Sequence, residues 1–101
     1  MNLGEIIAQD RRLAVLRTLH EAPGAQLNEG AMQHAMNYLG HQVGQDMVRA
    51  DLEWLKQHNL VRIEQLTVPR GELWLAKLLA AGADVANGRS THPGVARPDP
   101  E

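Results

Sequence analysis

The sequence predicts a mainly helical α+β domain with three helices, a two-stranded β-hairpin and a fourth short helix. Apolar residues recur at helical spacing in three segments before residue 59. After the third of these, two short apolar runs flank a Pro-Arg-Gly turn, which is typical of a β-hairpin. Aromatic residues make up only 3% of the chain, so the core is expected to consist of Leu, Val, Ile, Met and Ala.

Composition excludes several classes of protein. With 101 residues and no cysteine, the chain is expected to form one small domain without disulfides, Cys-based zinc sites or thiolate chemistry. No apolar run approaches the ~20 residues of a membrane span, and the N-terminus lacks a signal-peptide pattern. We therefore expect a cytoplasmic protein with no membrane partner. The formal net charge of −2 counts against strong nonspecific DNA binding without excluding DNA binding.

The first predicted helix spans residues 5–21 and ends at Ala22-Pro23-Gly24, because proline cannot continue a helix. Its arginines are expected on the solvated side, with a DNA backbone as the alternative contact. The predicted inward residues are Ile6, Leu13, Leu16 and Leu19, and the arginines are Arg11, Arg12 and Arg17.

Asn28 is a suitable N-cap for the second helix, and Gly40 is expected to end it. Between them, an apolar stripe recurs at helical spacing and comprises Met32, Ala35, Met36 and Leu39. Gly44 is expected to cap the third helix and Asn59 to follow its end. The third helix should bury Val48, Leu52 and Leu55.

The hairpin is predicted as strands 60–68 and 72–77 around a loop at residues 67–71. Val61 and Ile63 should face inward, and Leu73 and Leu75 should lie on the opposite face from Trp74. A fourth helix over residues 78–87 ends at Gly88. Residues 1–88 are thus expected to form the domain and residues 89–101, rich in proline, an extended or disordered tail.

The order of helices and hairpin, together with VRADLEWLKQHNLV, resembles the winged helix-turn-helix superfamily, including regulators of the arsenic-repressor type. The segment LLAAGADVANGR is similar to the helix that commonly follows the wing, although Leu79 stands where threonine usually caps it. The resemblance implies a winged helix with three helices, a two-stranded wing and a fourth short helix.

The whole chain resembles a family of small winged-helix proteins encoded by Mu-like phages and prophages. The likeness is carried by IIAQDRRLAVLRTLHEAPG, VRADLEWL and GRSTHPGVARP. Members are usually described as transcriptional regulators or as phage proteins of unknown function. The resemblance therefore implies a phage-type protein and supports the fold more than the activity.

In a helix-turn-helix, the outer face of the second helix of the unit reaches base edges in the major groove. Glutamine suits adenine and arginine suits guanine, so the third helix is a candidate reader of DNA. The alternative is a solvated helix face that only maintains solubility. Arg70 at the hairpin tip, supported by Arg62, is a candidate phosphate contact. The candidate contacts on the helix are Gln45, Asp46, Arg49, Glu53 and Lys56.

Trp54 is expected at the edge of the core, whereas Trp74 is equally compatible with a core edge and an exposed interface anchor. The histidines lack metal-ligand spacing, and no Walker loop, Gly-x-Ser-x-Gly or paired-carboxylate motif occurs. We therefore expect no metal, no cofactor and no enzymatic activity.

Two functions follow as hypotheses. The first is a DNA-binding transcriptional regulator of phage type that binds double-stranded DNA as a homodimer, since two half-sites multiply affinity. The fourth helix with part of the first is its expected dimer surface. The second is a winged-helix adaptor that binds a phage or host protein without binding DNA.

Overall fold

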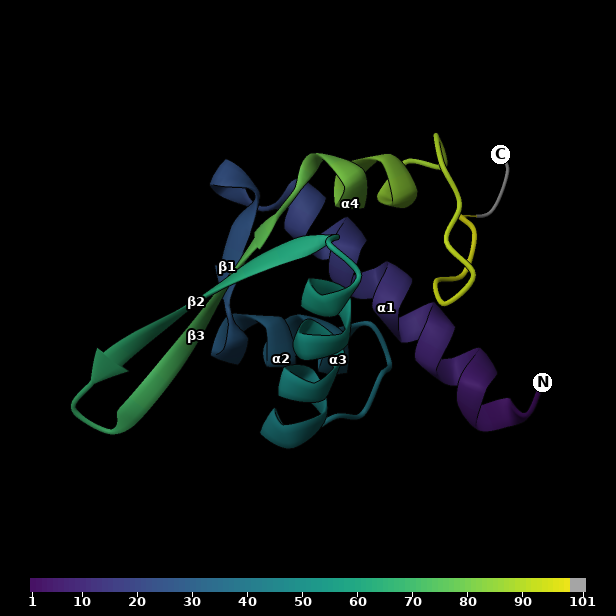
Figure 1. Cartoon of the computed structure of the whole chain (residues 1–101). Coiled ribbons are helices and arrows are strands. Elements are labelled where there is room, and N and C mark those ends of the chain that lie inside the picture. The colour runs from purple at the N-terminus through teal and green to yellow at the C-terminus, as the bar shows by residue number, and fades with distance from the viewer. Residues whose placement is uncertain (99–101) are drawn as a thin grey trace.

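The computed structural model describes residues 1–98 as four α-helices and a three-stranded antiparallel sheet (Figure 1). This confirms the predicted α+β class and the order of helices and hairpin. The elements are α1 (Leu3–Glu21), a 3-10 turn η1 (Pro23–Ala25), β1 (Gln26–Asn28), α2 (Glu29–Tyr38), α3 (Gln45–Gln57), β2 (Val61–Val68), β3 (Gly71–Leu78) and α4 (Ala80–Ala86).

The helix ends follow local capping chemistry. The Asn28 side chain accepts a hydrogen bond from the Ala31 backbone N–H at 2.9 Å, which confirms it as the N-cap of α2. Gly40 and Asn59 adopt φ of 95° and 61°, the left-handed conformation expected after α2 and α3. At the start of the chain, the Asn2 side chain caps α1, so this helix begins two residues earlier than predicted.

The short strand β1 was not predicted. It pairs antiparallel with β3, from Gln26 opposite Lys77 to Asn28 opposite Leu75, and gives the sheet the order β1-β3-β2. Three residues are too few for an alternating pattern to stand out in the sequence. β1 therefore ties the segment before α2 to the hairpin.

The hairpin turn is tighter than the predicted loop at residues 67–71. Val68 pairs with Gly71, and Thr67 pairs with Glu72, so only Pro69 and Arg70 lie outside the ladder. Gly71 has φ of 125°, which a residue with a Cβ rarely adopts. Because both strands run to the turn, the hairpin extends well beyond the helices (Figure 1).

The core lies between the helices and one face of the sheet and is aliphatic, as expected. Val61 and Ile63 point into it, and Trp54 packs at its edge. On β3, Trp74 lies on the face that points into the core: it packs against the buried cluster, to which Ala76, two residues further along, belongs. Leu73 and Leu75 lie on the opposite face of the sheet. The largest fully buried side chains include Leu16, Leu19, Met32, Met36, Leu52 and Leu55.

Three predictions for α1 are wrong. Arg12 was expected on the solvated side, but its side chain is only 13% exposed and its guanidinium lies 4.0 Å over the Trp54 ring. Ile6 was expected in the core, but the residue is 51% exposed, because the N-terminal half of α1 projects past the helices it packs on (Figure 1). Arg11 was expected on the solvated side, but it is buried and its Nη2 donates to Asp51 Oδ1 at 2.9 Å. The Arg11–Asp51 ion pair joins α1 to α3, and loss of one partner of such a pair typically costs about 3–5 kcal/mol.

The segment after α4, residues 89–98, is irregular, with a turn at residues 93–94, and part of it packs on α1. Val95 is only 4% exposed and belongs to the core cluster. The Ala96 N–H donates to the Gln9 carbonyl at 3.1 Å, and Arg12 Nη1 donates to the Gly94 carbonyl at 3.0 Å. Residues 94–96 of the expected tail therefore contact the domain that was expected to end at residue 88. Residues 99–101 of the expected tail lie outside the described residues.

Replacement of Gly82 in α4 should destabilise the protein. A Cβ on Gly82 would lie 2.1 Å from the Leu60 carbonyl oxygen, so Gly82→Ala must push α4 away from the start of β2. We expect a loss of about 1–3 kcal/mol in the free energy of unfolding, measured by urea denaturation. Gly4→Ala is the control, since Gly4 is exposed in the first turn of α1 and a Cβ there would lie at ordinary van der Waals distance, 3.4 Å, from the Asn2 side chain. Equal stability of the two variants would contradict this account of the packing.

Candidate functional site

The carboxylate of Glu29, at the start of α2, joins three elements of the candidate interface. Its oxygens accept hydrogen bonds from Arg49 Nε at 2.6 Å and Arg49 Nη2 at 2.8 Å. Gln45 Nε2 donates at 3.1 Å, and the Trp74 backbone N–H donates at 2.7 Å. The Glu29 side chain is 4% exposed, so this is a nearly buried carboxylate with four donors.

The position of Glu29 follows from the early end of β1. β1 stops at Asn28, opposite Leu75, so the next N–H on that edge of β3, that of Trp74, has no strand partner. The Glu29 carboxylate accepts from this N–H, and Arg49 Nη2 donates to the Glu72 carbonyl at 3.1 Å on the same edge. The Glu29–Arg49 pair thus continues the edge pairing that β1 begins.

The electrostatics of this pair keep both groups charged. Hydrogen bonds from Arg49 lower the pKa of Glu29 to about 2 against the opposing effect of burial, and bonds from Trp74 and Gln45 add to the lowering. Glu29 in turn raises the pKa of Arg49. The Arg49 guanidinium also lies 4.9 Å from the centre of the Trp74 ring. At neutral pH the pair is therefore fully ionised.

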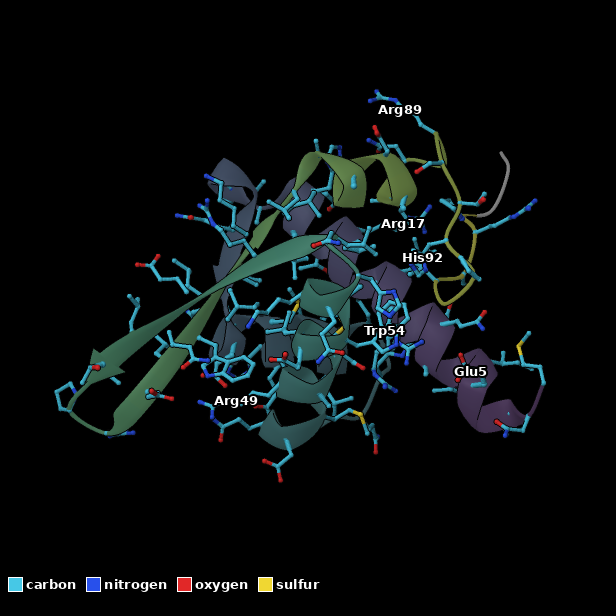
Figure 2. The ribbon with its side chains drawn as sticks, viewed as in Figure 1. Glu5, Arg17, Arg49, Trp54, Arg89 and His92 are labelled. Atoms are coloured by element: carbon cyan, nitrogen blue, oxygen red, sulfur yellow. The ribbon has the colours of Figure 1, made fainter. Side chains whose placement is uncertain are left out.

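This network places two of the predicted DNA contacts in structural roles. Arg49 is 29% exposed and holds α3 against α2 and the hairpin (Figure 2). Gln45 is exposed but bonded to the same carboxylate. Sequence reasoning missed Glu29, because an acid in the first turn of a helix already has a local explanation in the helix dipole.

The outermost face of α3 is acidic. Asp46 and Glu53 lie opposite the buried Val48 and Leu52, with Ala50 between them. Glu53 accepts a hydrogen bond from Gln57 at 3.3 Å, an i, i+4 pair along the helix. Lys56, exposed, is two turns beyond Arg49 on the flank that faces the hairpin. Asp51 is not part of this face, because it is buried against Arg11.

The hairpin tip and the start of α3 border one recess of about 420 Å³. It brings together Gln45 and Arg70, both predicted contacts, although they lie on different elements. Arg62 is not part of it: it pairs with Lys77 across the strands, on the sheet face that points away from the core. The other lining residues are Glu29, Gly30, Gln33, Val68, Glu72 and Leu73.

A second polar cluster holds the C-terminal segment against α3 (Figure 2). The Trp54 ring stacks on His58 at 3.8 Å and meets His92 edge-on at 5.3 Å, and the Arg12 guanidinium lies 4.0 Å over it. Burial, then His58 and Arg12, lowers the pKa of His92. A Cβ on Gly94 would lie 2.3 Å from Trp54, so the chain approaches this ring closely. The cluster attaches residues 92–94 to the domain.

The part of the chain that the structure describes was also searched for metal-binding clusters and for membrane-spanning helices. In residues 1–98, no three His, Asp or Glu side chains come together in a way that could hold a metal ion. None of the helices formed by these residues combines the length and the apolar character that a membrane crossing requires.

Comparison with known proteins relates the chain to phages. The uncharacterized protein gp26 of Escherichia phage Mu is 38% identical over 98 residues, which cover 97% of each chain. The chain belongs to the family of phage Mu gp26. An uncharacterized protein of Haemophilus influenzae is 42% identical over 66 residues, or 65% of this chain and 64% of that protein. No protein-family model matches the chain. The expected phage-type family is thus confirmed.

The low pKa of Glu29 predicts a specific pH dependence of stability. Because its pKa is lower in the folded protein than in the unfolded chain, its contribution is complete above pH ~4.5 and is lost as the pH falls towards 2. A shift of this size corresponds to roughly 3 kcal/mol. Urea unfolding between pH 6 and 2 should therefore show a smaller fall in stability for Glu29→Gln than for the wild type.

Asp46→Asn is the matched control, since Asp46 lies exposed in the first turn of α3. Its stability should follow the wild-type pH curve. Parallel curves for Glu29→Gln and the wild type would show that the carboxylate does not hold these elements together.

Proposed function

We propose that the protein is a winged helix-turn-helix domain that binds double-stranded DNA as a phage-type transcriptional regulator. In this proposal α2 and α3 form the helix-turn-helix and the β2–β3 hairpin is the wing. The observation that carries it is the shared recess, in which Gln45 at the start of α3 lies with Arg70 at the hairpin tip. Family membership supports the phage setting.

The contacts differ in kind along this surface. The first turn of α3 enters the major groove, where Gln45 can pair with adenine, and Arg70 neutralises a backbone phosphate. Arg49 acts mainly by fixing the angle between α3 and the hairpin, because its guanidinium is bound to Glu29. Lys56, further along α3, and Arg62, on the sheet, offer weaker phosphate contacts at the margins.

The acids on α3 limit what the surface can bind. Asp46 and Glu53 repel phosphates and can accept hydrogen bonds only from base amino groups such as that of cytosine. With few free cations on each copy, a single domain binds weakly. A homodimer that engages two half-sites is therefore part of the proposal.

The acidic outer face of α3 favours a second candidate. Asp46, Ala50 and Gln57 are exposed and Glu53 is half-buried, and together they form a strip with two negative charges and no cation. Such a strip suits a basic surface of a phage or host protein through electrostatic complementarity. In this alternative the domain is an adaptor, and DNA is not its partner.

Arg70→Ala should weaken DNA binding at every DNA sequence. Loss of one phosphate contact lowers the slope of log affinity against log salt by about 1 for each copy of the domain. Fluorescence anisotropy with phage DNA, titrated from 50 mM salt upwards, measures this slope. Arg89→Ala is the control, since Arg89 is a highly exposed arginine after α4. Indistinguishable slopes for the two variants would remove the hairpin from the DNA contact.

The double variant Asp46→Asn/Glu53→Gln separates the two candidates. If DNA lies along α3, removal of two repulsive charges should tighten binding several-fold at 50 mM salt. If a basic protein is the partner, the same variant should lose that protein in a pull-down from infected cells. Unchanged DNA affinity together with loss of the partner would decide for the adaptor.

A further inference from the structure

The large hydrophobic side chains that stay exposed gather along one side of the molecule. The N-terminal half of α1 contributes three of them and Met1 precedes it, with exposed fractions between 45% and 86%. The loop after α2 and the first turn of α3 add two more nearby. These exposed residues are Met1, Leu3, Ile6, Ile7, Leu39 and Met47, and Tyr38 precedes Leu39 in the chain.

On α1 the exposed residues form a regular stripe. Leu3, Ile6 and Ile7 have the i, i+3, i+4 spacing by which one helix packs on another. Only part of this half of the helix is covered, and it reaches past the rest of the domain (Figure 1). A stripe of this kind on a protruding helix is unusual for an isolated small domain.

An apolar groove of about 610 Å³ runs beside the stripe. Ile6 and Ile7 form one wall, and Val43 belongs to the loop that forms the other. A second recess adjoins it, shares Asp10 and His41 with it, and extends to Leu39. We call the stripe and the two recesses together the α1 face.

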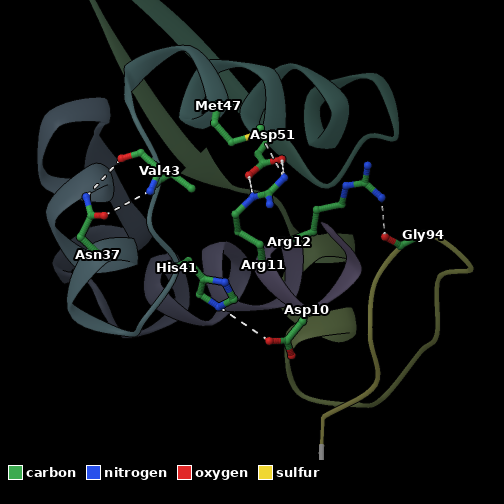
Figure 3. Close-up of polar contacts among 9 residues, drawn as sticks. All are labelled: Asp10, Arg11, Arg12, Asn37, His41, Val43, Met47, Asp51 and Gly94. Atoms are coloured by element: carbon green, nitrogen blue, oxygen red, sulfur yellow. Dashed lines mark hydrogen bonds and ion pairs between the residues drawn. The ribbon is translucent and has the colours of Figure 1, made fainter. Parts of the chain in front are cut away.

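Hydrogen bonds and ion pairs fix the segments that form the walls of the groove. The Asn37 side chain accepts from the Val43 N–H at 3.1 Å and donates to the Val43 carbonyl at 3.3 Å (Figure 3). His41 lies 3.7 Å from Asp10 across the seam between the recesses. Beneath them, Arg11 is paired with Asp51 and donates to Met47 Sδ at 3.2 Å. The groove is therefore preformed and its shape is fixed.

We propose that the α1 face is the surface on which a second copy of this chain docks, in a two-fold dimer. A two-fold contact uses the same patch on both copies, so each patch must offer both a projection and a cavity. The α1 face does so: the stripe projects and the groove lies directly beside it. The rim carries both Asp10 and Arg17, so a self-complementary contact can pair opposite charges.

The available area suits a stable dimer. The six exposed residues leave roughly 650 Å² on each copy, which lies within the range of about 600–1,000 Å² that a standard interface buries per partner. The expected dimer surface on α4 lacks this property, since its exposed residues there are the small Ala80 and Ala81. The dimer rests on the α1 face alone and stands whether or not the domain binds DNA.

Sedimentation equilibrium of the full chain without DNA, from about 5 to 500 μM, tests the proposal. The wild type should approach twice 11.1 kDa. Ile6→Lys should raise the dissociation constant at least ~tenfold, because it places a charge in the middle of the interface. Thr67→Lys adds the same charge at an exposed site on the hairpin and should dimerise as the wild type does.

A disulfide test uses the absence of cysteine from the chain. Ile7→Cys should give a covalent dimer on mild oxidation, and Thr67→Cys should not. The proposal is overturned if the wild type keeps the monomer mass over the whole concentration range, or if the Ile6→Lys variant dimerises as the wild type does. If the wild type is monomeric, the α1 face is instead a docking surface for a helix of a different protein. Thermal unfolding of each variant checks that the fold is kept.

Discussion

One buried carboxylate determines where the hairpin lies relative to the helices. β1 is too short to pair with all of β3, so the exposed edge of β3 needs other hydrogen-bond partners. Glu29 and Arg49 supply them, and in doing so they connect the start of α2, the middle of α3 and the part of β3 next to the hairpin turn. Without this pair, the hairpin would be attached to α3 mainly through the apolar contacts of β2 with the core.

The same pair restricts the function of α3. A guanidinium that donates two hydrogen bonds to a buried carboxylate cannot also present those donors to a guanine. Arg49 is therefore a poor reader of bases, however well its position in the helix suits that role. In the proposed DNA complex, Gln45 and the hairpin tip therefore make most of the contacts. The acids on α3 weaken the electrostatic attraction between the domain and DNA. The engaged Arg49 guanidinium and the acids on α3 are also the two observations that favour the adaptor alternative.

The sequence predicted those parts of the fold that depend on neighbouring residues. Asn28, Gly40 and Asn59 end or begin helices through their own side chains or backbone angles, so their roles could be read locally. The alternation of Val61 and Ile63 placed the inner face of β2 for the same reason.

Contacts between distant residues were missed. Arg11 and Asp51 are separated by forty positions, and each looks like an ordinary surface charge in its own helix. Glu29 suits the first turn of a helix without any distant partner. Ile6 was misplaced because helical spacing shows which residues share a face, but not how far along the helix that face stays covered. The bonds that join Glu29 to Arg49, Gln45 and Trp74 could therefore not be predicted from the sequence.

The two ion pairs together make α3 a fixed element between two surfaces. Arg11–Asp51 attaches it to α1, and Arg49–Glu29 attaches it to α2 and the hairpin. The α1 face and the hairpin tip lie towards opposite ends of a molecule about 43 Å long (Figure 1). A dimer formed through the α1 face would therefore hold its two hairpins far apart at a set distance. Such an assembly is suited to binding two separated sites on a partner. The ion pairs Arg11–Asp51 and Arg49–Glu29 hold α3 on both sides and so keep the hairpin of each copy at a fixed angle to its α1 face.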